Sequence, residues 1–496
     1  MLRFNVFENG APAKQLELTH AHLLGGERVP IRGELRFESG QIICEPRSRV
    51  AASLAVLWSV KGFGRVLLET PRLLDRKEPY NLLVELARGQ MMRISLKRED
   101  WGLYDYPDGA SVYRDVESAR DLLLDAMTAA DDTGASALAE QALAAALRAG
   151  EAVGALHADC YLSRRAAMGQ TPPGAIGGRL DVAETYKSSG GPVTVHPQRI
   201  PKGLDFLSIP MSWRHIEPKE GKASLTVIEP WVRAVRDRKM NLWASALLTF
   251  DAAHRPTWWK GSARDFERLR DAAAKHLRQM FKALTPHVAA WEVCSGLHAE
   301  NPFKLNLEQI MDLTRLAASL ARQTSPKIPA ILTITPPWSD YYAADPQTIP
   351  ATLYAEMALQ SGIPFDAFGI EIRFDGARPG PCVRDLMQVS SILDRYGNLG
   401  KPLHVVAAGV PSSPPCTNGS WRGDWSEEIQ ANWLREFYQI ALSKPFVETV
   451  AWHGIADEPG VPACGGLLRA DLTPKPAYQE LIRFRDRLTR GAPDAS

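Results

Sequence analysis

The sequence predicts an α/β protein in which a (β/α)8 barrel follows a β-rich, sandwich-like domain and a short helical segment. Short apolar runs alternate with amphipathic helical patterns from about residue 175 to residue 485, and the composition changes near residues 113 and 170. Repeated βα units of this spacing imply a parallel sheet, and eight of them close into a barrel. An open doubly wound sheet is the competing topology. Since no GxGxxG motif follows an expected strand, its nucleotide-binding form is disfavoured.

Residues 1–112 are expected to form the β-rich domain. Short alternating segments broken by Gly, Pro and Asn predict strands at Leu2–Phe7, Arg32–Phe37, Val56–Val60 and Met91–Leu96. Two apolar runs, Val66–Leu68 and Leu82–Leu86, predict strands that are buried on both faces.

Residues 113–170 are expected to form a helical bridge. Leu, Ala and Met recur there at helical spacing, and proline is absent from Asp115 to Gln170. A break near Asp131–Gly134 predicts two helices, which we expect to pack as an antiparallel pair against the barrel or the β-domain. The turn cluster at Gln170–Gly178 then leads into the barrel domain, residues 171–490.

The barrel domain contains eight expected strands and several expected helices. The strands are Ala175–Leu180, Leu204–Ile209, Asn241–Thr249, Ala289–Cys294, Ala330–Thr335, Ala367–Ile372, Leu403–Ala407 and Thr449–His453. The helical patterns are Trp231–Lys239, Phe266–Leu284, Leu307–Gln323, Thr348–Gln360, Cys382–Tyr396 and Glu427–Ser443.

Composition excludes several classes of function. A net charge of +1 over 496 residues argues against a dedicated nucleic-acid binder or a polybasic membrane protein. No apolar run is long enough for a transmembrane helix, and Met1–Gly10 lacks the apolar core of a signal peptide, so a cytoplasmic protein is expected. The six cysteines form no CxxC pair, and we expect no metal and no cofactor.

Six segments of the barrel domain follow, in order, the pattern of a known family. Those with the most matching positions are FLSIPMSWRHIEPKEGKASL (206–225), which includes Met211, Trp213, Glu217, Pro218 and Gly221, and WASALLTFDAAHRPTWW (243–259), which includes Pro256 and Trp258. The others are VAAWEVCSG (288–296), FDAFGIEIRF (365–374), KPLHVVAAGV (401–410), and TVAWHGIADEP (449–459) with GLLRADLTPKPAYQEL (466–481). Together they resemble the family-ten glycoside hydrolases, the xylanase family, over about 300 residues, and the first 170 residues take no part in the match.

The resemblance implies a (β/α)8 barrel with two catalytic glutamates, and here those positions hold Gly296 and Ala407. A retaining glycosidase needs two carboxyl groups about 5–5.5 Å apart, one to protonate the leaving oxygen and one to attack the sugar. Neither Gly nor Ala can do either. Positions that grip the sugar in the family also differ, with Leu247 in place of a histidine and Asp251 in place of a tryptophan.

Candidate site residues come from the carboxyl ends of the expected strands, where such barrels bind ligands. The candidates for relocated catalytic carboxylates are Glu371, Glu300 and Asp251. The candidates for substrate contact are Trp213, Trp258, His298, Asn301, Arg373, Trp421, His453 and Asp457. The structural alternatives are a salt bridge between Glu371 and Arg373 inside the barrel, solvated loop charges, and tryptophans buried in the core.

Three hypotheses of function follow. The first is a carbohydrate-binding protein with the family's glutamates lost, whose partner is a β-linked oligo- or polysaccharide. The second is an active O-glycosyl hydrolase, similar to an endo-1,4-β-xylanase, that uses relocated carboxylates. The third is a non-catalytic scaffold whose N-terminal domain binds a protein partner. None of the three calls for nucleic acid or a membrane, and fold alone does not choose among them.

Overall fold

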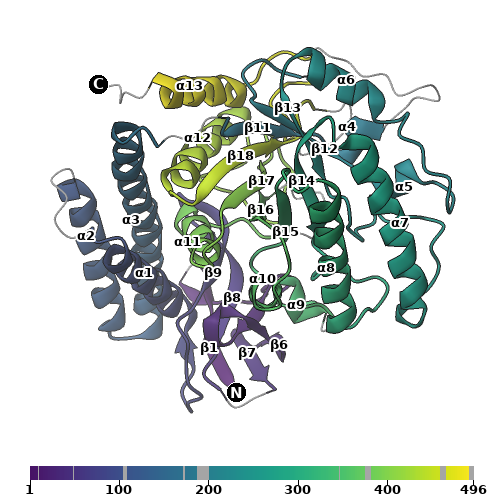
Figure 1. Cartoon of the computed structure of the whole chain (residues 1–496). Coiled ribbons are helices and arrows are strands. Elements are labelled where there is room, and N and C mark those ends of the chain that lie inside the picture. The colour runs from purple at the N-terminus through teal and green to yellow at the C-terminus, as the bar shows by residue number, and fades with distance from the viewer. Residues whose placement is uncertain are drawn as a thin grey trace.

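The C-terminal part of the molecule is a closed barrel of parallel strands, as the sequence predicted (Figure 1). The computed structural model describes residues 1–8, 10–47, 50–103, 109–170, 174–186, 200–345, 347–374, 381–457 and 465–490. The strands pair in chain order, and the first closes on the last through the pairs Gly177–Ala451 and Arg179–His453. They are β11 (Ile176–Arg179), β12 (Phe206–Pro210), β13 (Asn241–Ser245), β14 (Val288–Ser295), β15 (Ala330–Ile334), β16 (Ala367–Arg373), β17 (Leu403–Gly409) and β18 (Val447–His453).

Helices surround the barrel and its mouth (Figure 1). They are α4 (Val182–Tyr186), α5 (Trp213–Ile216), α6 (Glu229–Asp237), α7 (Phe266–Leu284), α8 (Leu307–Thr324), α9 (Tyr341–Ala344), α10 (Ala351–Gln360), α11 (Leu386–Gly397), α12 (Glu427–Ser443) and α13 (Pro476–Arg490). Each of the six expected helical patterns is confirmed, and those of α7 and α12 have the predicted bounds. The turn cluster at Gln170–Gly178 runs into β11, and its residues 171–173 lie outside the described residues.

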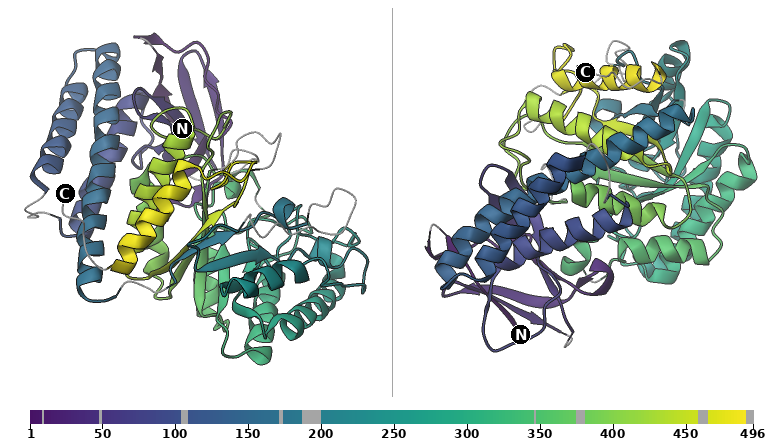
Figure 2. Two further views of the ribbon diagram at one scale, coloured as in Figure 1. Left: turned by 90° about the horizontal axis from the view of Figure 1, so that it is seen from above. Right: turned by 90° about the vertical axis from the view of Figure 1, so that its left-hand side faces the viewer.

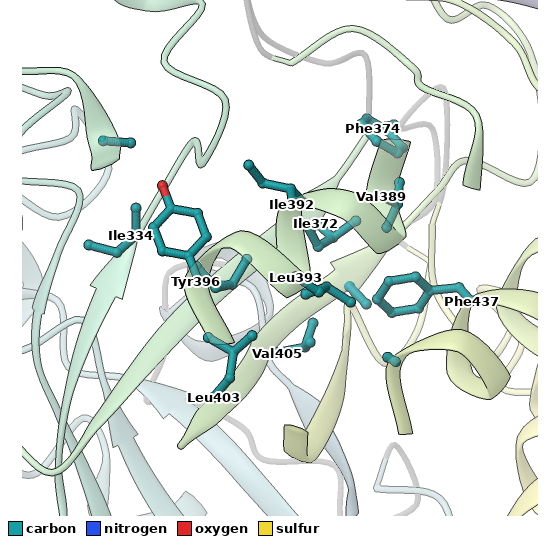
Figure 3. Packing of buried hydrophobic residues seen from close by; sticks show 14 of the residues in the cluster. Ile334, Ile372, Phe374, Val389, Ile392, Leu393, Tyr396, Leu403, Val405 and Phe437 are labelled. Carbon is teal, nitrogen blue, oxygen red and sulfur yellow. The ribbon is translucent and has the colours of Figure 1, made fainter. Parts of the chain in front are cut away.

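The barrel core has two parts, because successive side chains of a strand point to opposite sides. Outward-facing residues pack against the helices: Figure 3 shows Ile372 of β16 and Val405 of β17 lying among Leu393 of α11 and Phe437 of α12. Inside the barrel a separate apolar cluster of Ala290, Ile331, Ala367 and Val406 packs beside Trp243. The lumen is therefore filled with side chains, and a ligand site is restricted to its mouth.

The N-terminal region begins with short strands in two four-stranded sheets and one two-stranded ribbon. One sheet has the order β10-β1-β7-β6 and the other β5-β4-β8-β9, while β2 pairs with β3. The strands are β1 (Leu2–Asn5), β2 (Phe7–Glu8), β3 (Ala11–Pro12), β4 (His22–Leu24), β5 (Pro30–Ile31), β6 (Gly33–Glu38), β7 (Gln41–Pro46), β8 (Ser53–Val60), β9 (Gly64–Glu69) and β10 (Tyr80–Asn81). The predicted β-rich start of the chain is confirmed.

The strands predicted at Leu82–Leu86 and Met91–Leu96 are wrong, since both segments belong to helix α1 (Leu82–Asp100). The side chain of Asn81 caps this helix by accepting a hydrogen bond from the Val84 N–H. Its buried apolar residues recur at helical rather than alternating spacing, so packing selects a helix where the apolar runs had indicated strands.

Two further helices follow, α2 (Ala110–Met127) and α3 (Asp132–Ala167), and the predicted break near Asp131–Gly134 is confirmed. Asp131 caps α3 by accepting a hydrogen bond from the Gly134 N–H at 2.7 Å. With 36 residues, α3 is about 54 Å long. It joins the two halves of the molecule because Arg165, near its end, donates to the carbonyl groups of Leu442 and Lys444 beside the barrel. Figure 2 shows the three helices side by side along one flank of the barrel. The division of the chain at residues 112 and 170 stays a prediction.

Candidate functional site

A cleft of about 160 Å³ opens at the carboxyl ends of the barrel strands. Seven of the eight strands end at or beside it, which is the position expected of a ligand site in this architecture. Its polar and charged lining residues are Arg179, Asp181, Thr249, Asp251, His254, Ser295, Glu300, Thr335, Glu371, Arg373 and His453. Gly296, Pro210, Pro336 and a few small aliphatic residues complete the wall.

Arg179 of β11 and Glu371 of β16 form the floor of the cleft, and Glu292 of β14 lies behind them. Arg179 Nη1 donates to Glu292 Oε2 at 2.9 Å, and Arg179 Nη2 lies 3.4 Å from Glu371 Oε1. The other oxygen of Glu371 accepts a hydrogen bond from Thr335 Oγ1 at 3.0 Å and lies 3.9 Å from Arg373 Nη1. One guanidinium thus joins two carboxylates that come from two different strands across the barrel.

The electrostatics of these two carboxyl groups differ. Burial alone would raise the pKa of Glu371, but Arg179, Arg373 and His453 outweigh burial and hold its pKa below the ordinary value. Burial raises the pKa of Glu292, and Arg179 only partly offsets this effect because Glu371 adds negative charge nearby. Glu371 is therefore a stable anion at neutral pH.

Two carboxylate–imidazole pairs flank the floor. Asp251 Oδ2 lies 2.5 Å from His254 Nδ1, and Asp181 Oδ2 lies 3.3 Å from His453 Nε2. Burial opposes ionisation of Asp181, yet the hydrogen bond and charge of His453 hold its pKa well below the ordinary value. Burial and the nearby charge of Arg373 lower the pKa of His453. Each pair offers a ligand one oxygen-rich acceptor and one imidazole edge.

Glu184 of α4 lies behind this cleft rather than in its wall. Its carboxyl oxygens accept hydrogen bonds from the backbone N–H groups of Asp181, Ile455 and Ala456 at 2.7–3.0 Å. It therefore ties the segment after β11 to the segment after β18. Burial raises the pKa of Glu184 to about 7.

The positions that correspond to the family's catalytic glutamates lie near the cleft. Gly296 lines the cleft with φ at +64°, a conformation that side-chain-bearing residues rarely adopt, and a Cβ there would lie 3.2 Å from Thr335 Cγ2. Ala407 is fully buried in β17, directly opposite Glu371 of β16. The correspondence of these two residues to the family's glutamates stays a prediction.

The cleft brings together five of the residues predicted from the sequence. All three candidate carboxylates line it, and so do two of the residues proposed for substrate contact: Asp251, Glu300, Glu371, Arg373 and His453. The expected same-side arrangement of Glu371 and Arg373 on β16 holds, because both contribute to the wall.

Four other candidates, near strands β12 to β14, do not line the cleft. Trp213 is buried, stacks on His276, and its Nε1 donates to Glu217 Oε2 at 2.8 Å. Trp258 is half-buried against Trp213, and its Nε1 donates to the Glu217 carbonyl. His298 is fully buried against Tyr341 and Tyr354.

Asn301 is the fourth candidate that does not line the cleft. Its side-chain amide donates to the carbonyls of Leu305 and Gln347 and so holds its own loop in place. These four side chains make structural contacts, and their role in ligand binding stays a prediction.

Trp421 and Asp457, two further candidates for ligand contact, do not line the cleft and make structural contacts. Trp421 is buried, and its Nε1 donates to Glu151 Oε1 of α3 at 2.7 Å, so it belongs to the seam between the barrel and the helices. Asp457 pairs with the buried Lys475 at 2.5 Å and accepts from the Gly466 N–H. Trp421 thus packs in the interior of the molecule, where most of the surface of a tryptophan side chain is usually buried.

Sequence analysis missed several residues of the wall. The most important are Arg179, Asp181 and His254. Arg179 lies at the carboxyl end of the first expected strand and Asp181 directly follows it, so the rule that selected the other candidates applies to them as well. No signal in the sequence identifies His254, because it lies nine residues after the end of β13, in a loop, and is placed by its contact with Asp251.

Among the described residues, no group of His, Cys, Asp and Glu is arranged to hold a metal ion. Five cysteines are described, and all five are free thiols. Within the same ranges, no helix has the length and apolar character needed to cross a membrane.

The fold and site together define a (β/α)8 barrel with a charged, polar cleft at its mouth, and three solved structures similar to it are xylanases or members of family 10. Xylanase 10B from Thermotoga maritima has 16% identity and a TM-score of 0.48, with 66% of this chain and 99% of that chain covered. A GH10 protein from Paenibacillus barcinonensis has 17% identity and a TM-score of 0.48, with 66% and 98% covered. Xylanase B from Clostridium stercorarium F9 has 16% identity and a TM-score of 0.46, with 62% and 96% covered.

No protein-family model matches the chain, and no curated protein matches it. The assignment of the (β/α)8 architecture rests on the strand pairing described above.

Proposed function

We propose that the mouth cleft binds a β-linked saccharide and does not hydrolyse it. This proposal rests on the observation that three of the four carboxylates in the cleft wall, Asp181, Asp251 and Glu371, each lie against an imidazole or a guanidinium. Carboxylates accept hydrogen bonds from sugar hydroxyls, while Arg and His donate to the hydroxyl oxygens. The wall therefore presents fixed, alternating acceptors and donors, which is what a polyhydroxylated ligand needs. The sugar class comes from the family resemblance of the sequence.

Hydrolysis by the family mechanism also needs a carboxyl group that still holds a proton near neutral pH. Asp181 and Glu371 have lowered pKa values, so neither supplies that proton. Glu184 and Glu292 have raised pKa values, but neither lines the cleft. Asp181 and Glu371 therefore accept hydrogen bonds as anions and offer the ligand no acidic proton.

The wall also lacks a stacking platform. Among the described residues that line the cleft, none is Phe, Tyr or Trp. Saccharide sites often stack a sugar face on an aromatic ring, and without one the binding energy comes from hydroxyl pairing. We therefore expect selectivity for the orientation of hydroxyl groups and little tolerance of their loss, since an unpaired buried partner is costly.

A second candidate function rests on the Asp251–His254 pair. A histidine oriented by a carboxylate is a common general acid, and Glu371, a stable anion in the same cleft, would stabilise positive charge at the sugar carbon. This arrangement corresponds to a glycoside hydrolase with relocated catalysis. It predicts that turnover depends on His254 as well as on Glu371.

Two assays on the full-length protein separate these functions. Saturation-transfer NMR with xylo- and cello-oligosaccharides should show binding that Glu371→Gln weakens at least about tenfold, while the surface variant Glu480→Gln on α13 leaves it unchanged. Aryl β-xylosides, aryl β-cellobiosides and soluble xylan should release no product above the level of a boiled control. Product release that disappears in His254→Gln, Glu371→Gln or Glu300→Gln would establish a relocated hydrolase instead.

A further inference from the structure

A second open depression lies far from the mouth, in the N-terminal region. Helices α1 and α2 both pack on α3 (Figures 1 and 2). A groove of about 470 Å³ remains between α1 and α2. The groove is lined by Arg88, Met91, Met92, Ser95, Leu96, Arg98, Val116, Glu117, Arg120 and Leu123. At one end Arg98 of α1 lies over the Tyr113 ring of α2, 5.0 Å from its centroid, and links the two helices.

The groove and its surroundings are unusually apolar for a surface. Four large apolar residues of these two helices are about half exposed: Met92 (48%), Leu96 (59%), Leu124 (52%) and Met127 (54%). Clustered exposed apolar residues with a polar rim are typical of protein-binding sites. Methionine is common at such sites because its flexible, polarisable side chain adapts to the partner.

The charged residues of the groove are mainly basic. Arg88, Arg98 and Arg120 line it, and Glu117 is the acidic residue among the lining side chains. Arg120 pairs with its neighbour Asp121 at 3.1 Å, and both side chains are exposed, whereas Arg88 pairs at 3.1 Å with Glu85, whose side chain is buried. An exposed pair contributes little, so Arg120 can exchange its carboxylate for one offered by a partner.

We infer that this groove docks an amphipathic α-helix of another protein, with an apolar stripe and acidic flanks. Two helices of 19 and 18 residues that rest on a third leave room for a fourth, and a helix in that place would complete a four-helix arrangement. A second copy of this chain is a poor occupant. Two-fold pairing would bring the same groove of each copy together. Each groove is lined by more arginine residues than acidic residues, so the two would repel each other.

The test uses the full-length protein and two fluorescent synthetic peptides of about 18 residues, enough for about five helical turns. Both peptides carry the same leucine stripe, one with glutamate flanks and the other with lysine flanks. Fluorescence anisotropy should show that the acidic peptide binds at least about tenfold more tightly than the basic one. Leu96→Glu should weaken the acidic peptide about tenfold or more, because it places a charge in the apolar groove.

Two further variants make the result specific. Arg120→Glu should weaken the acidic peptide and strengthen the basic one, since it reverses a rim charge. Leu353→Glu, at an exposed position of α10, is the matched control and should change neither affinity. The inference would be overturned if the two peptides bound equally well or if neither bound. It would also be overturned if Leu96→Glu left the affinity for the acidic peptide unchanged. A concentration-dependent dimer in analytical ultracentrifugation that Leu96→Glu dissolves would assign the groove to a second copy and overturn it as well.

Discussion

The barrel mouth contains two layers of carboxyl groups that differ in their surroundings. Asp181 and Glu371 line the cleft, and their cationic partners lower their pKa values despite burial. Glu184 and Glu292 lie behind the cleft, and burial raises their pKa values. The front layer therefore presents negative charge to a ligand, and the back layer holds the structure in place.

Arg179 shows how the difference arises, because it contacts a member of each layer. Glu371 has the guanidinium of Arg373 nearby in addition to that of Arg179, whereas Arg179 provides the guanidinium beside Glu292. The Glu371 side chain is also more exposed, at 12% against 3% for Glu292. Burial thus determines the charge state only where cations are too few to offset it. In this cleft, the number of cations separates ligand-facing anions from structural carboxyl groups.

Removal of Arg179 should cause the largest loss of stability, because Arg179 contacts a carboxylate in each layer. Arg179→Met leaves Glu292 and Glu371 buried without their shared cation, and we expect a loss of about 4 kcal/mol in the free energy of unfolding. Arg373→Met is the matched control. Its guanidinium lies 3.9 Å from Glu371 and is more exposed, so about 1 kcal/mol is expected. Urea unfolding measures both, and equal losses would show that Arg179 does not join the layers.

The back layer should make stability fall as pH rises. Glu184 has a pKa of about 7 in the folded protein against 4.5 in the unfolded chain, so the folded state binds the extra proton between these values. Its contribution is full below pH 4.5 and is lost as pH rises through about 7. Relative to Glu184→Gln, the wild-type protein should lose about 2 kcal/mol between pH 5 and pH 8.

The front layer should have the opposite effect, so that stability falls as the pH is lowered. The lowered pKa of Glu371 contributes stability above pH 4.5 that is lost as the pH falls, and Glu371→Gln should flatten this acid limb. Urea midpoints measured across the pH range for the wild type and the two Gln variants test both signs. Identical pH profiles for the two variants would contradict the division into layers.

The smallest effect concerns the backbone where β14 ends. Gly296→Ala should cost about 1–2 kcal/mol in the free energy of unfolding, because φ at +64° strains a residue that bears a Cβ. Gly362→Ala is the matched control, with φ at +63° and open space around the added methyl group. A larger loss at Gly296 than at Gly362 in urea unfolding would reflect the Thr335 methyl group, which would lie 3.2 Å from the added Cβ. No loss at either position would contradict the strain argument.

The barrel could be predicted from the sequence because local pattern and tertiary environment agree there. Each of the eight expected strands was found, since a parallel strand buried on both faces is a continuous apolar run such as that of Leu403–Gly409. The same rule failed at Leu82–Leu86, because a buried helix also begins with an apolar run. Only the packing of α1 against its neighbours distinguishes the two cases.

The candidate site was predicted in part. Position at a strand end found Glu371, Arg373 and His453, because the parallel strands bring their carboxyl ends to one mouth. Trp421 and His298 were selected for their positions after strands seven and four, and both side chains are buried in structural contacts. The pairing of Asp251 with His254 depends on the conformation of a loop, which no periodic pattern encodes.

Isothermal titration calorimetry of the full-length protein with a β-linked xylo-oligosaccharide distinguishes binding from hydrolysis at the mouth, because it records both in one experiment. If the cleft binds the sugar without hydrolysing it, the heats saturate and return to the baseline after each injection, and affinity is lost in Glu371→Gln and Arg373→Met. A steady heat flow after each injection that Glu371→Gln abolishes would show hydrolysis at the mouth and contradict the proposal of binding without hydrolysis.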